Sequence, residues 1–406
     1  MLSEAMIQAE SETLRPYASG LYRWFHQHPE LAHHEVETNR KIREELDRYG
    51  VSYLAPAPNI TIAVVHGGRK GAVVGLRCDT DALPVREETG LPFRSETEGV
   101  MHACGHDAHI TIGLCTARIL QKYREERQGT VKIIFQPAEE GEGGADKVIA
   151  TGLVDDVDVF FAIHVWSPFA SGTVHASPII VSAAVNMFTI RIKGLGGHGA
   201  TPEKCADAVA AGAAVVTEIQ SIVSRSVSPM EPAVITIGSF HAGAAGNVVA
   251  EEAVLKGTAR ALNEETREHL ARQIEAVAQH AAQIHGCTAA VENLRICDAV
   301  QNDPRVTALA LQCAKALVPV AQIGEQRTMM LGDDFANYGK IAPYCYGQVG
   351  IADSEKKTGY AHHNGRFHVD EDALPVCVAW MASFAAAAGA GWQPVKAGAV
   401  PENNTP

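Results

Sequence analysis

The sequence predicts an α/β protein of two domains, one built on a largely parallel sheet and the other inserted into it. Its 406 residues exceed what one hydrophobic core usually supports. Short runs rich in Val, Ile and Phe alternate with a helical pattern in the first half, which predicts strands buried under helices. Between residues 178 and 300 the pattern changes to the order βαββαβ, which predicts a small self-contained sandwich.

In the first domain, apolar residues at helical spacing predict N-terminal helices at residues 7–24 and 36–49 and a third helix at 110–123. Runs of β-branched and aromatic residues predict its strands, at 60–66, 72–78, 131–136 and 159–165. From residue 303 onward helix and strand alternate again, so this domain is discontinuous and comprises residues 1–184 and 297–406. The Ala-, Gly-, Pro- and Asn-rich tail at 389–406 is expected to be poorly ordered.

The inserted domain is predicted at residues 185–296. Its expected strands are 187–193, 233–241, 253–261 and 288–295, and its expected helices are 206–227 and 264–285.

Composition restricts the partners and the compartment. A net charge of −13 without clustered Lys or Arg argues against a nucleic-acid partner. Apolar stretches such as 378–390 are too short for a membrane span. Nine scattered cysteines without a CxxC pair argue against a disulfide framework, and the N-terminus lacks a secretory pattern. We therefore expect a soluble protein of the reducing cytoplasm.

The segment MHACGHDAH at 101–109 is the densest group of chemically active side chains. It places Cys104 and His106 two residues apart, followed by Asp107 and His109, in a loop that contains glycine. Thiolate and imidazole together suit a divalent ion such as zinc, cobalt, nickel or manganese, and nothing here resembles an all-oxygen calcium site. The alternative is a buried structural cysteine with histidines that cap a helix or lie on the surface.

A second group is IIFQPAEEGEGGA, in which an apolar strand leads directly into Glu139 and Glu140. Adjacent carboxylates at the end of a buried strand repel each other unless a cation or a proton compensates them. One glutamate could bind a metal while the other serves as general base. The alternative is a solvated acidic turn before a glycine loop.

Further histidines follow. His164 lies at the carboxyl end of the strand VFFAIHVW, where open α/β sheets place their sites, although a lone histidine in such a run is more often a core residue. The segment GYAHHNGRFHVDED offers His362, His363 and His368, for which a surface cluster is the alternative.

The strand end LRCDTDALP places Asp79 and Asp81 on the same face. Asp81 could orient a histidine that binds metal, or it could be a helix cap or turn former.

Seven motifs in order, HQHPEL, LRCDTDALP, MHACGHDAH, QPAEEGEGGA, AIHVW, GGHGATP and AHHNGRF, resemble the M20 metallopeptidase family across nearly the whole chain. The likeness is to its amidohydrolase branch, which includes N-acyl-amino-acid, hippurate, indole-acetyl-amino-acid and aminobenzoyl-glutamate hydrolases.

The resemblance implies two divalent metal ions per subunit, Mn, Zn, Co or Ni, in the discontinuous domain. The residues that match ligand positions are Cys104, His106, Glu140, His164 and His363. Glu139 matches the general base. Whether His362 or His363 is the last ligand stays open at this stage.

The resemblance also implies that the inserted domain is a lid and dimerisation module, so that a homodimer or a higher homo-oligomer is expected. His198 of GGHGATP matches a residue that reaches the partner subunit's active site and stabilises the oxyanion. Asn247 and Arg260 match positions that bind a substrate carboxylate or the oxyanion, although a turn Asn and a surface Arg are the simpler interpretations.

The implied function is hydrolysis of the amide of an N-acyl or N-aroyl amino acid, a small carboxylate-bearing substrate, by metal-activated water with Glu139 as base. Rival interpretations are hydrolytic deamination of an aminoaryl carboxylic acid, which releases ammonia, a dipeptidase or carboxypeptidase, and a non-catalytic binding protein that retains the fold.

Three positions depart from the family pattern: Asp333 stands where glutamate is customary, Gly365 where proline follows the His-Asn pair, and Ala250 where the lid segment usually has proline. None of them removes a ligand, and together they suggest an unusual substrate pocket.

Overall fold

The computed structural model describes residues 2–141 and 143–393, which form two compact units. The first unit comprises the residues up to Ile179, Asn302–Arg327 and the residues from Asn337 on, and the second comprises Ile180–Gln301 and Thr328–Ala336. The α/β class with two domains is confirmed.

The division differs in detail from the boundaries expected from the sequence, which gave residues 180–184, 297–301 and 328–336 to the first domain. In the structure Ile180–Ser182 (β7) pairs with Val300–Gln301 (β14). The amide of Met329 donates to the carbonyl of Val181, and that of Ala183 donates to Leu331. These short segments therefore pack with the second unit.

The first unit is built on an eight-stranded sheet in the order β1-β2-β4-β3-β5-β16-β6-β15. The pairs β4–β3, β3–β5, β5–β16 and β6–β15 are parallel, while β1–β2, β2–β4 and β16–β6 are antiparallel. The centre of the sheet is thus parallel and buried, as the apolar runs predict. The strands are Ser52–Ala57 (β1), Ile60–His66 (β2), Arg69–Asp79 (β3), Gln128–Gln136 (β4), Val159–Ala170 (β5), Val174–His175 (β6), Ile323–Gly324 (β15) and Tyr344–Ala352 (β16).

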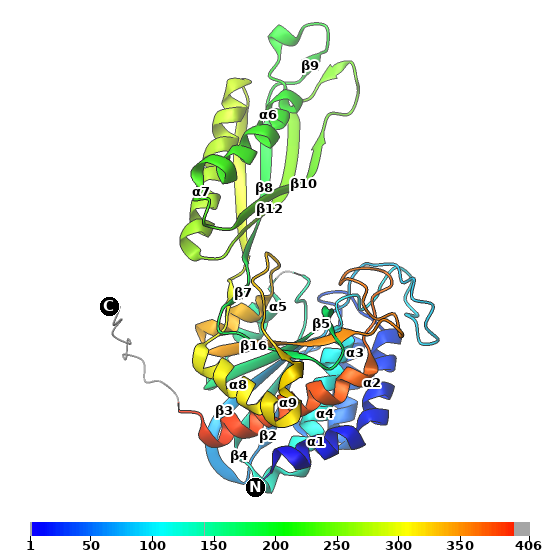
Figure 1. Ribbon diagram of the computed structural model, residues 1–406. Coiled ribbons are helices and arrows are strands. Elements are labelled where there is room, and N and C mark those ends of the chain that lie inside the picture. Colours follow the sequence, from blue (N-terminus) through cyan, green and yellow to red (C-terminus); the bar gives the residue numbers. More distant parts are fainter. Residues whose placement is uncertain (1, 142, 394–406) are drawn as a thin grey trace, which may run out of the picture. The chain divides into compact units, whose positions relative to one another are not determined.

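Helices cover this sheet (Figure 1), and they are Glu4–Thr13 (α1), Arg15–Gln27 (α2), Val36–Arg48 (α3), His106–Lys122 (α4), Gly144–Ile149 (α5), Pro304–Leu317 (α8) and Leu374–Gly391 (α9). The single helix expected at 7–24 is wrong, because the chain forms two helices that meet at Leu14. Pro16 lies in the first turn of α2, where a missing amide hydrogen is tolerated, whereas it would disrupt a continuous helix.

Helix α9 is a core helix. By length and composition alone Glu371–Gly391 could cross a membrane, but it is 78% buried inside the protein, and its Trp380 donates from Nε1 to the carbonyl of Ala310 at 2.8 Å. The helix continues through Gly389–Gly391, so the expected disorder from residue 389 is wrong there. Gly389 lets the helix approach the start of β4, because a Cβ atom would lie 2.5 Å from the carbonyl of Gln128. The tail beyond residue 393 lies outside the described residues.

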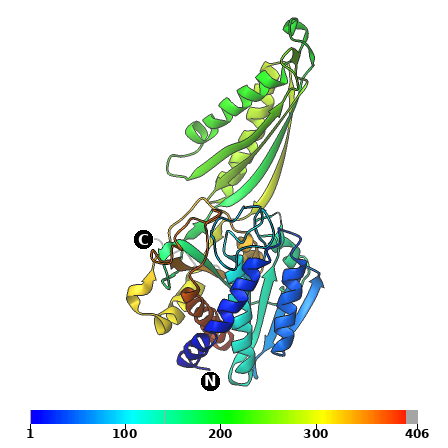
Figure 2. The same cartoon turned by 90° about the vertical axis from the view of Figure 1, so that its right-hand side faces the viewer.

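The second unit has the predicted order βαββαβ, with an antiparallel sheet in the order β10-β12-β8-β13. Both helices lie on one face of this sheet (Figure 2) and bury an apolar core that includes Ile190, Leu255 and Ile274. A short extra pair, β9 with β11, is added to this arrangement. The elements are Ala184–Lys193 (β8), Gly197–His198 (β9), Ala208–Ser221 (α6, extended by a π-helical turn at Ile222–Ser226), Ala233–Ala242 (β10), Val248–Val249 (β11), Glu252–Ala261 (β12), Glu264–Ile284 (α7) and Thr288–Cys297 (β13).

Candidate metal centre

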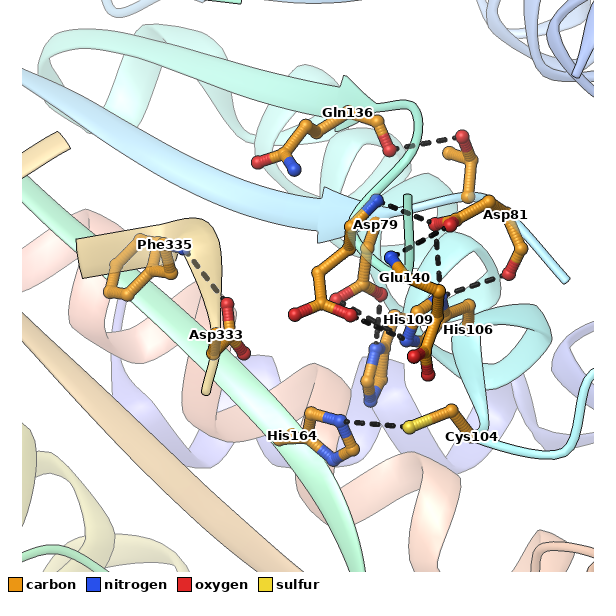
Figure 3. A network of polar contacts seen from close by, with 12 residues as sticks. Asp79, Asp81, Cys104, His106, His109, Gln136, Glu140, His164, Asp333 and Phe335 are labelled. Carbon is orange, nitrogen blue, oxygen red and sulfur yellow. Dashed lines mark hydrogen bonds and ion pairs between the residues drawn. The ribbon is translucent and has the colours of Figure 1, made fainter. Parts of the chain in front are cut away.

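The metal-binding side chains gather at the carboxyl edge of the parallel strands, the edge where open α/β sheets place their sites. Strand β5 contributes His164, the loop that follows β4 contributes Glu139 and Glu140, and the first turn of α4 contributes His106. Cys104 lies just before α4, and its sulfur points toward the His164 ring (Figure 3), with Sγ 3.6 Å from Nε2.

The five residues expected to bind metal form two overlapping groups within this unit. The ligand atoms of Cys104, His106 and His164 lie within 4.8 Å of one another, and so do those of Cys104, Glu140 and His363. Cys104 is common to both groups. These thiol, imidazole and carboxylate donors would suit divalent metal ions.

Hydrogen bonds fix the histidine tautomers so that one nitrogen of each ring faces the cluster. His106 donates from Nδ1 to the carbonyl of Asp81 at 2.9 Å, and His164 donates from Nδ1 to the carbonyl of Val165 at 2.7 Å. The lone pair of each Nε2 is therefore available. The buried Nε2 of His106 has no hydrogen-bond partner in the part of the chain that the structure describes.

The carboxylate of Glu140 is in a similar situation. Its Oε1 lies at ion-pair distance, 2.9 Å, from His363 Nε2, and among residues 2–141 and 143–393 it accepts no regular hydrogen bond. A buried oxygen and a buried nitrogen that both lack a hydrogen bond at one place are costly. A divalent cation would satisfy both, so the residues present fit a metal.

The pKa shifts of Cys104, His164 and His106 also favour a bound metal ion. Burial raises the pKa of the Cys104 thiol well above its usual range, and Glu140 and Glu139 raise it further, so the thiolate needs a cation. Burial lowers the pKa of His164 and keeps it neutral, as a ligand must be. Burial alone would lower the pKa of His106, but the charges of Asp79 and Asp81 outweigh it and raise the pKa to about 10. A metal ion would take the place of that proton.

Asp81 holds the segment after β4 that contains Ala138, Glu139 and Glu140, which we call the glutamate loop. Its Oδ1 accepts from the amide of Glu139 at 3.0 Å and its Oδ2 from the amide of Glu140 at 2.9 Å, while His106 is held chiefly by the Asp81 carbonyl. The residue thus contacts His106, and it also fixes both glutamate backbones.

The two neighbouring histidines have different partners. His362 donates from Nε2 to the Val165 carbonyl at 3.0 Å and places Nδ1 3.3 Å from Ser167 Oγ, so both nitrogens are engaged, and burial lowers its pKa to about 4. His363 has a left-handed backbone with φ 64° and donates its amide to the Ala103 carbonyl. Its ring reaches Glu140, so His363 is the residue that joins the cluster.

The sequence motifs contain His109 and Asp79 but indicate no separate role for either in the site. His109 donates from Nδ1 to Asp79 Oδ1 at 2.5 Å and accepts at Nε2 from the amide of Val165 at 3.0 Å, which leaves neither nitrogen for a metal. Asp79 also pairs with the buried guanidinium of Arg77. Alternation along LRCDTD could have indicated Asp79, but the contact with His109 comes from the fold.

The peptide group of Val165 connects three rings. Its carbonyl accepts from His164 and His362, and its amide donates to His109. One peptide on β5 therefore sets the tautomers of three histidines around the cluster.

The expected substrate residues lie in the second unit. His198 is exposed on β9, where its Nδ1 accepts from the Ala200 amide at 3.0 Å. Asn247 is exposed beside it, and its carbonyl accepts from the amide of Gly199 at 2.9 Å. Arg260 on β12 donates to the carbonyl of Met330 at 2.8 Å.

The departing positions have structural roles. A Cβ atom on Gly365 would lie 2.5 Å from the Arg86 carbonyl, and the Gly365 carbonyl accepts from the amide of Glu88. Ala250 is buried in the core of the second unit. Asp333 accepts from the amide of Phe335 at 2.8 Å and so starts a 3₁₀ turn.

A parallel sheet whose carboxyl edge carries thiol, imidazole and carboxylate donors beside a second carboxylate is the arrangement of a metallohydrolase. The sequence model of peptidase family M20/M25/M40 matches residues 75–387. The chain belongs to this family, and it is a metal-dependent amidohydrolase.

Individual relatives agree with this class. An N-acetylcysteine deacetylase of Bacillus subtilis (strain 168) is 36% identical over 89% of this chain and 93% of its own length. The IAA-amino acid hydrolase ILR1-like 4 of Arabidopsis thaliana is 33% identical over 90% of this chain and 84% of its own. Among solved structures, the YXEP protein of Bacillus subtilis, described as a dinuclear metal binding peptidase from the M20 family, is 31% identical with a TM-score of 0.79, and the match covers 92% of this chain and 98% of that one.

Proposed function

We propose that this chain hydrolyses the amide bond of N-acyl or N-aroyl amino acids. Cys104, His106, Glu140, His164 and His363 would hold two divalent ions of the manganese, zinc, cobalt or nickel type. The observation that carries the proposal is that His106 Nε2 and Glu140 Oε1, which both lack a hydrogen bond among the described residues, lie near the Cys104 thiol. The relatives whose names specify amides of amino acids support the substrate class.

When bound, such ions would polarise the scissile carbonyl and lower the pKa of an attacking water. Glu139 takes the proton of that water on its carboxylate and delivers it to the leaving nitrogen. Its position beside Glu140 supports this role, because its ligand oxygen lies within 4.8 Å of those of His106 and Glu140. Asp81 holds the backbone amides of both glutamates and so keeps the base and the ligand at a fixed separation.

The second unit would bind the substrate carboxylate and stabilise the oxyanion through His198, Asn247 and Arg260. Exposed His198 and Asn247 on adjoining segments support this assignment. We propose that the unit also forms a homodimer, that His198 serves the partner subunit, and that the enzyme works in the cytoplasm. Sedimentation velocity tests the dimer, which a monomer at micromolar concentration would exclude.

A peptide bond is the second candidate, because the solved relative with 31% identity is described as a peptidase. Mass-spectrometric product analysis with N-acyl amino acids, dipeptides and aminoaryl carboxylates separates the possibilities. We expect acyl cleavage that a chelator abolishes. Preferred cleavage of dipeptides would indicate a peptidase. Release of ammonia without an acyl product would indicate deamination and would contradict the proposed hydrolysis of the amide.

Glu139→Gln tests the base. The amide cannot accept the proton, so kcat should fall at least about 100-fold, as for loss of a general base. Metal content measured by mass spectrometry should stay at the wild-type value. Wild-type kcat in this variant would show that Glu139 is not the base.

A further inference from the structure

We propose that Glu35 is a positioning residue for Glu139, acting through the peptide of Ala138. This inference rests on the proposed function, which makes Glu139 the general base. Glu35 lies 103 positions before Ala138 in the sequence, yet its Oε1 accepts from the Ala138 amide at 2.8 Å inside the protein.

Three consecutive amides in the glutamate loop are bound by carboxylates. Ala138 donates to Glu35, and Glu139 and Glu140 donate to the two oxygens of Asp81 at 3.0 and 2.9 Å. Charge-assisted hydrogen bonds of this kind are stronger than those between neutral groups. The loop is therefore fixed by two separate carboxylates, and Glu35 holds the peptide directly before the base.

The Ala138 peptide needs such support. Ala138 has φ 53°, in the left-handed region that a residue with a Cβ atom rarely adopts, and it is fully buried. A backbone of this kind costs on the order of 1 kcal/mol and persists only where the surroundings hold it. Relaxation of Ala138 toward ordinary angles would turn the following residue, Glu139, away from its position.

Glu35 has no local task that accounts for its burial. It is the N-cap residue of α3, but its side chain makes no capping bond, and the amides of Glu37 and Thr38 are capped by Glu30 instead. The remaining oxygen of Glu35 accepts from Asn59 Nδ2 at 3.1 Å. A fully buried carboxylate that leaves its own helix uncapped and reaches a distant loop indicates a role at that loop.

The segment around Glu35 contacts both parts of the loop. The carbonyl of Glu30 accepts from the amide of Ala82, directly after Asp81, and Leu31 bridges to Ala82. On the other side, a Cβ atom on Gly141 would lie 2.8 Å from Cβ of Ala32. Residues 30–35 thus support the Asp81 turn and the glutamate loop together.

The first test compares Glu35→Ala with Glu45→Ala. Glu45 is a matched control, since it is also buried, lies in α3, the helix that follows Glu35, and bonds to Tyr17 and Lys41 away from the loop. We expect Glu35→Ala to lower kcat at least about 10-fold with KM within about 3-fold and metal content unchanged, whereas Glu45→Ala should change neither kinetic constant more than about 2-fold. Unchanged kcat in Glu35→Ala, or an equal fall in both variants, would refute the positioning role.

Hydrogen exchange of the metal-free protein provides a readout that needs no turnover. Mass spectrometry of the peptide covering 136–141 should show the Ala138 amide exchanging at least about 10-fold faster in Glu35→Ala and at the wild-type rate in Glu45→Ala. Unchanged exchange in Glu35→Ala would overturn the inference. If the wild type hydrolysed no substrate, the proposed function would fail while this measurement still decided the contact.

A double-mutant cycle with Ala138→Gly links the contact to the strained backbone. Glycine adopts positive φ without strain, so the Glu35→Ala loss in kcat should be at least about 3-fold smaller in the Ala138→Gly background. Glu35→Gln keeps an oxygen acceptor and should retain kcat within about 3-fold. If Glu35→Ala lowered kcat equally in the wild-type and the Ala138→Gly backgrounds, the left-handed backbone of residue 138 would not contribute to the effect. That result would contradict the proposal.

Discussion

His362 and His363 are neighbours in the chain but have opposite environments. His362 is held by Val165 and Ser167, and its ring lies 4.6 Å from that of Trp166 between centroids. His363 places its ring beside Glu140 through a left-handed backbone. One residue supports the cluster and the other belongs to it.

His363→Ala should therefore lower the metal content by about one ion per subunit and abolish turnover. His362→Ala removes a buried ring and should instead cost about 2 kcal/mol of unfolding free energy. Plasma mass spectrometry of the purified variants and urea denaturation distinguish the two effects. Full metal content in His363→Ala together with loss of metal in His362→Ala would reverse the assignment.

His26, on α2, is a buried histidine that contacts two carboxylates. Its Nδ1 lies 2.7 Å from Asp107 and its Nε2 3.3 Å from Glu87. Burial alone would lower its pKa, but the hydrogen bonds and charges of the two carboxylates outweigh it and raise the pKa to about 9. Because the pKa of His26 is higher in the folded than in the unfolded state, protonation of His26 stabilises the fold fully below the unfolded pKa near 6.5. This stabilisation is lost as the pH rises above about 9.

We expect the unfolding free energy to fall by about 3 kcal/mol between pH 6.5 and 9.5, since each pKa unit corresponds to about 1.4 kcal/mol. Urea denaturation at the two pH values measures the change. His26→Asn lacks the titrating ring and should show a clearly smaller fall. An equal fall in both proteins would assign the pH dependence to other groups.

At this scale the sequence predicts short-range pairs better than distant ones. Cys104 and His106 were found because they stand two residues apart in a glycine-containing loop, and Glu139 and Glu140 because they follow an apolar strand. The contact of Glu35 with Ala138 could not be found this way, because it depends on how α3 lies against the β4 loop.

Among the elements, α9 shows how closely a helix approaches the sheet. Gly347 on β16 faces Trp380, and a Cβ atom there would lie 2.3 Å from the indole ring. The indole is fully buried and is held by its bond to Ala310. The glycine is required by this approach and not by its backbone angles.

Gly347→Ala should therefore destabilise the protein by about 1–3 kcal/mol through overpacking. The matched control is Gly20→Ala in α2, where a Cβ atom would have no neighbour within 4 Å and alanine favours the helix by about 1 kcal/mol. Thermal unfolding of the two variants should shift in opposite directions. A stabilised Gly347→Ala protein would show that the indole moves at little cost.

Periodicity predicted most elements but not their breaks. Apolar spacing continues through residues 7–24, and only Pro16 indicates that α1 ends and α2 begins. Helix α4 begins four residues before the apolar pattern, because its first turn is formed by His106 and other polar residues. The short strands β6 and β15 have two residues each, too few for any periodicity.

At the scale of the molecule, the second unit has a core of its own, formed between its sheet and helices α6 and α7. Residues 180–301 form one uninterrupted stretch that contains all of these elements. We expect this fragment to fold alone and to unfold cooperatively in urea with mixed helix and strand circular dichroism. A fragment that shows no cooperative transition would mean that residues 328–336 or the first unit are needed for folding.

The fold class was predictable because alternation of strand and helix leaves few arrangements, and the βαββαβ order identified the insertion. The position at which the chain re-enters the eight-stranded sheet after the insertion was not predictable. Strand β16 lies beside β5, where Gln348 pairs with His164, which precedes it by 184 positions (348 − 164). Long-range packing sets this placement, and no local pattern in the sequence indicates it.

The peptide of Val165 has a consequence for how the centre tolerates mutation. The groups of Val165 that bond to His109, His164 and His362 belong to the main chain, so nearly every substitution at residue 165 leaves them in place. Only proline would remove the amide. In a saturation library, proline should be excluded at this position. The other substitutions should be limited only by the space beside Gly105, where a Cβ atom would lie 2.4 Å from the Val165 side chain. The contribution of Val165 to these histidine tautomers therefore depends on the backbone and is largely insensitive to point mutation at this position.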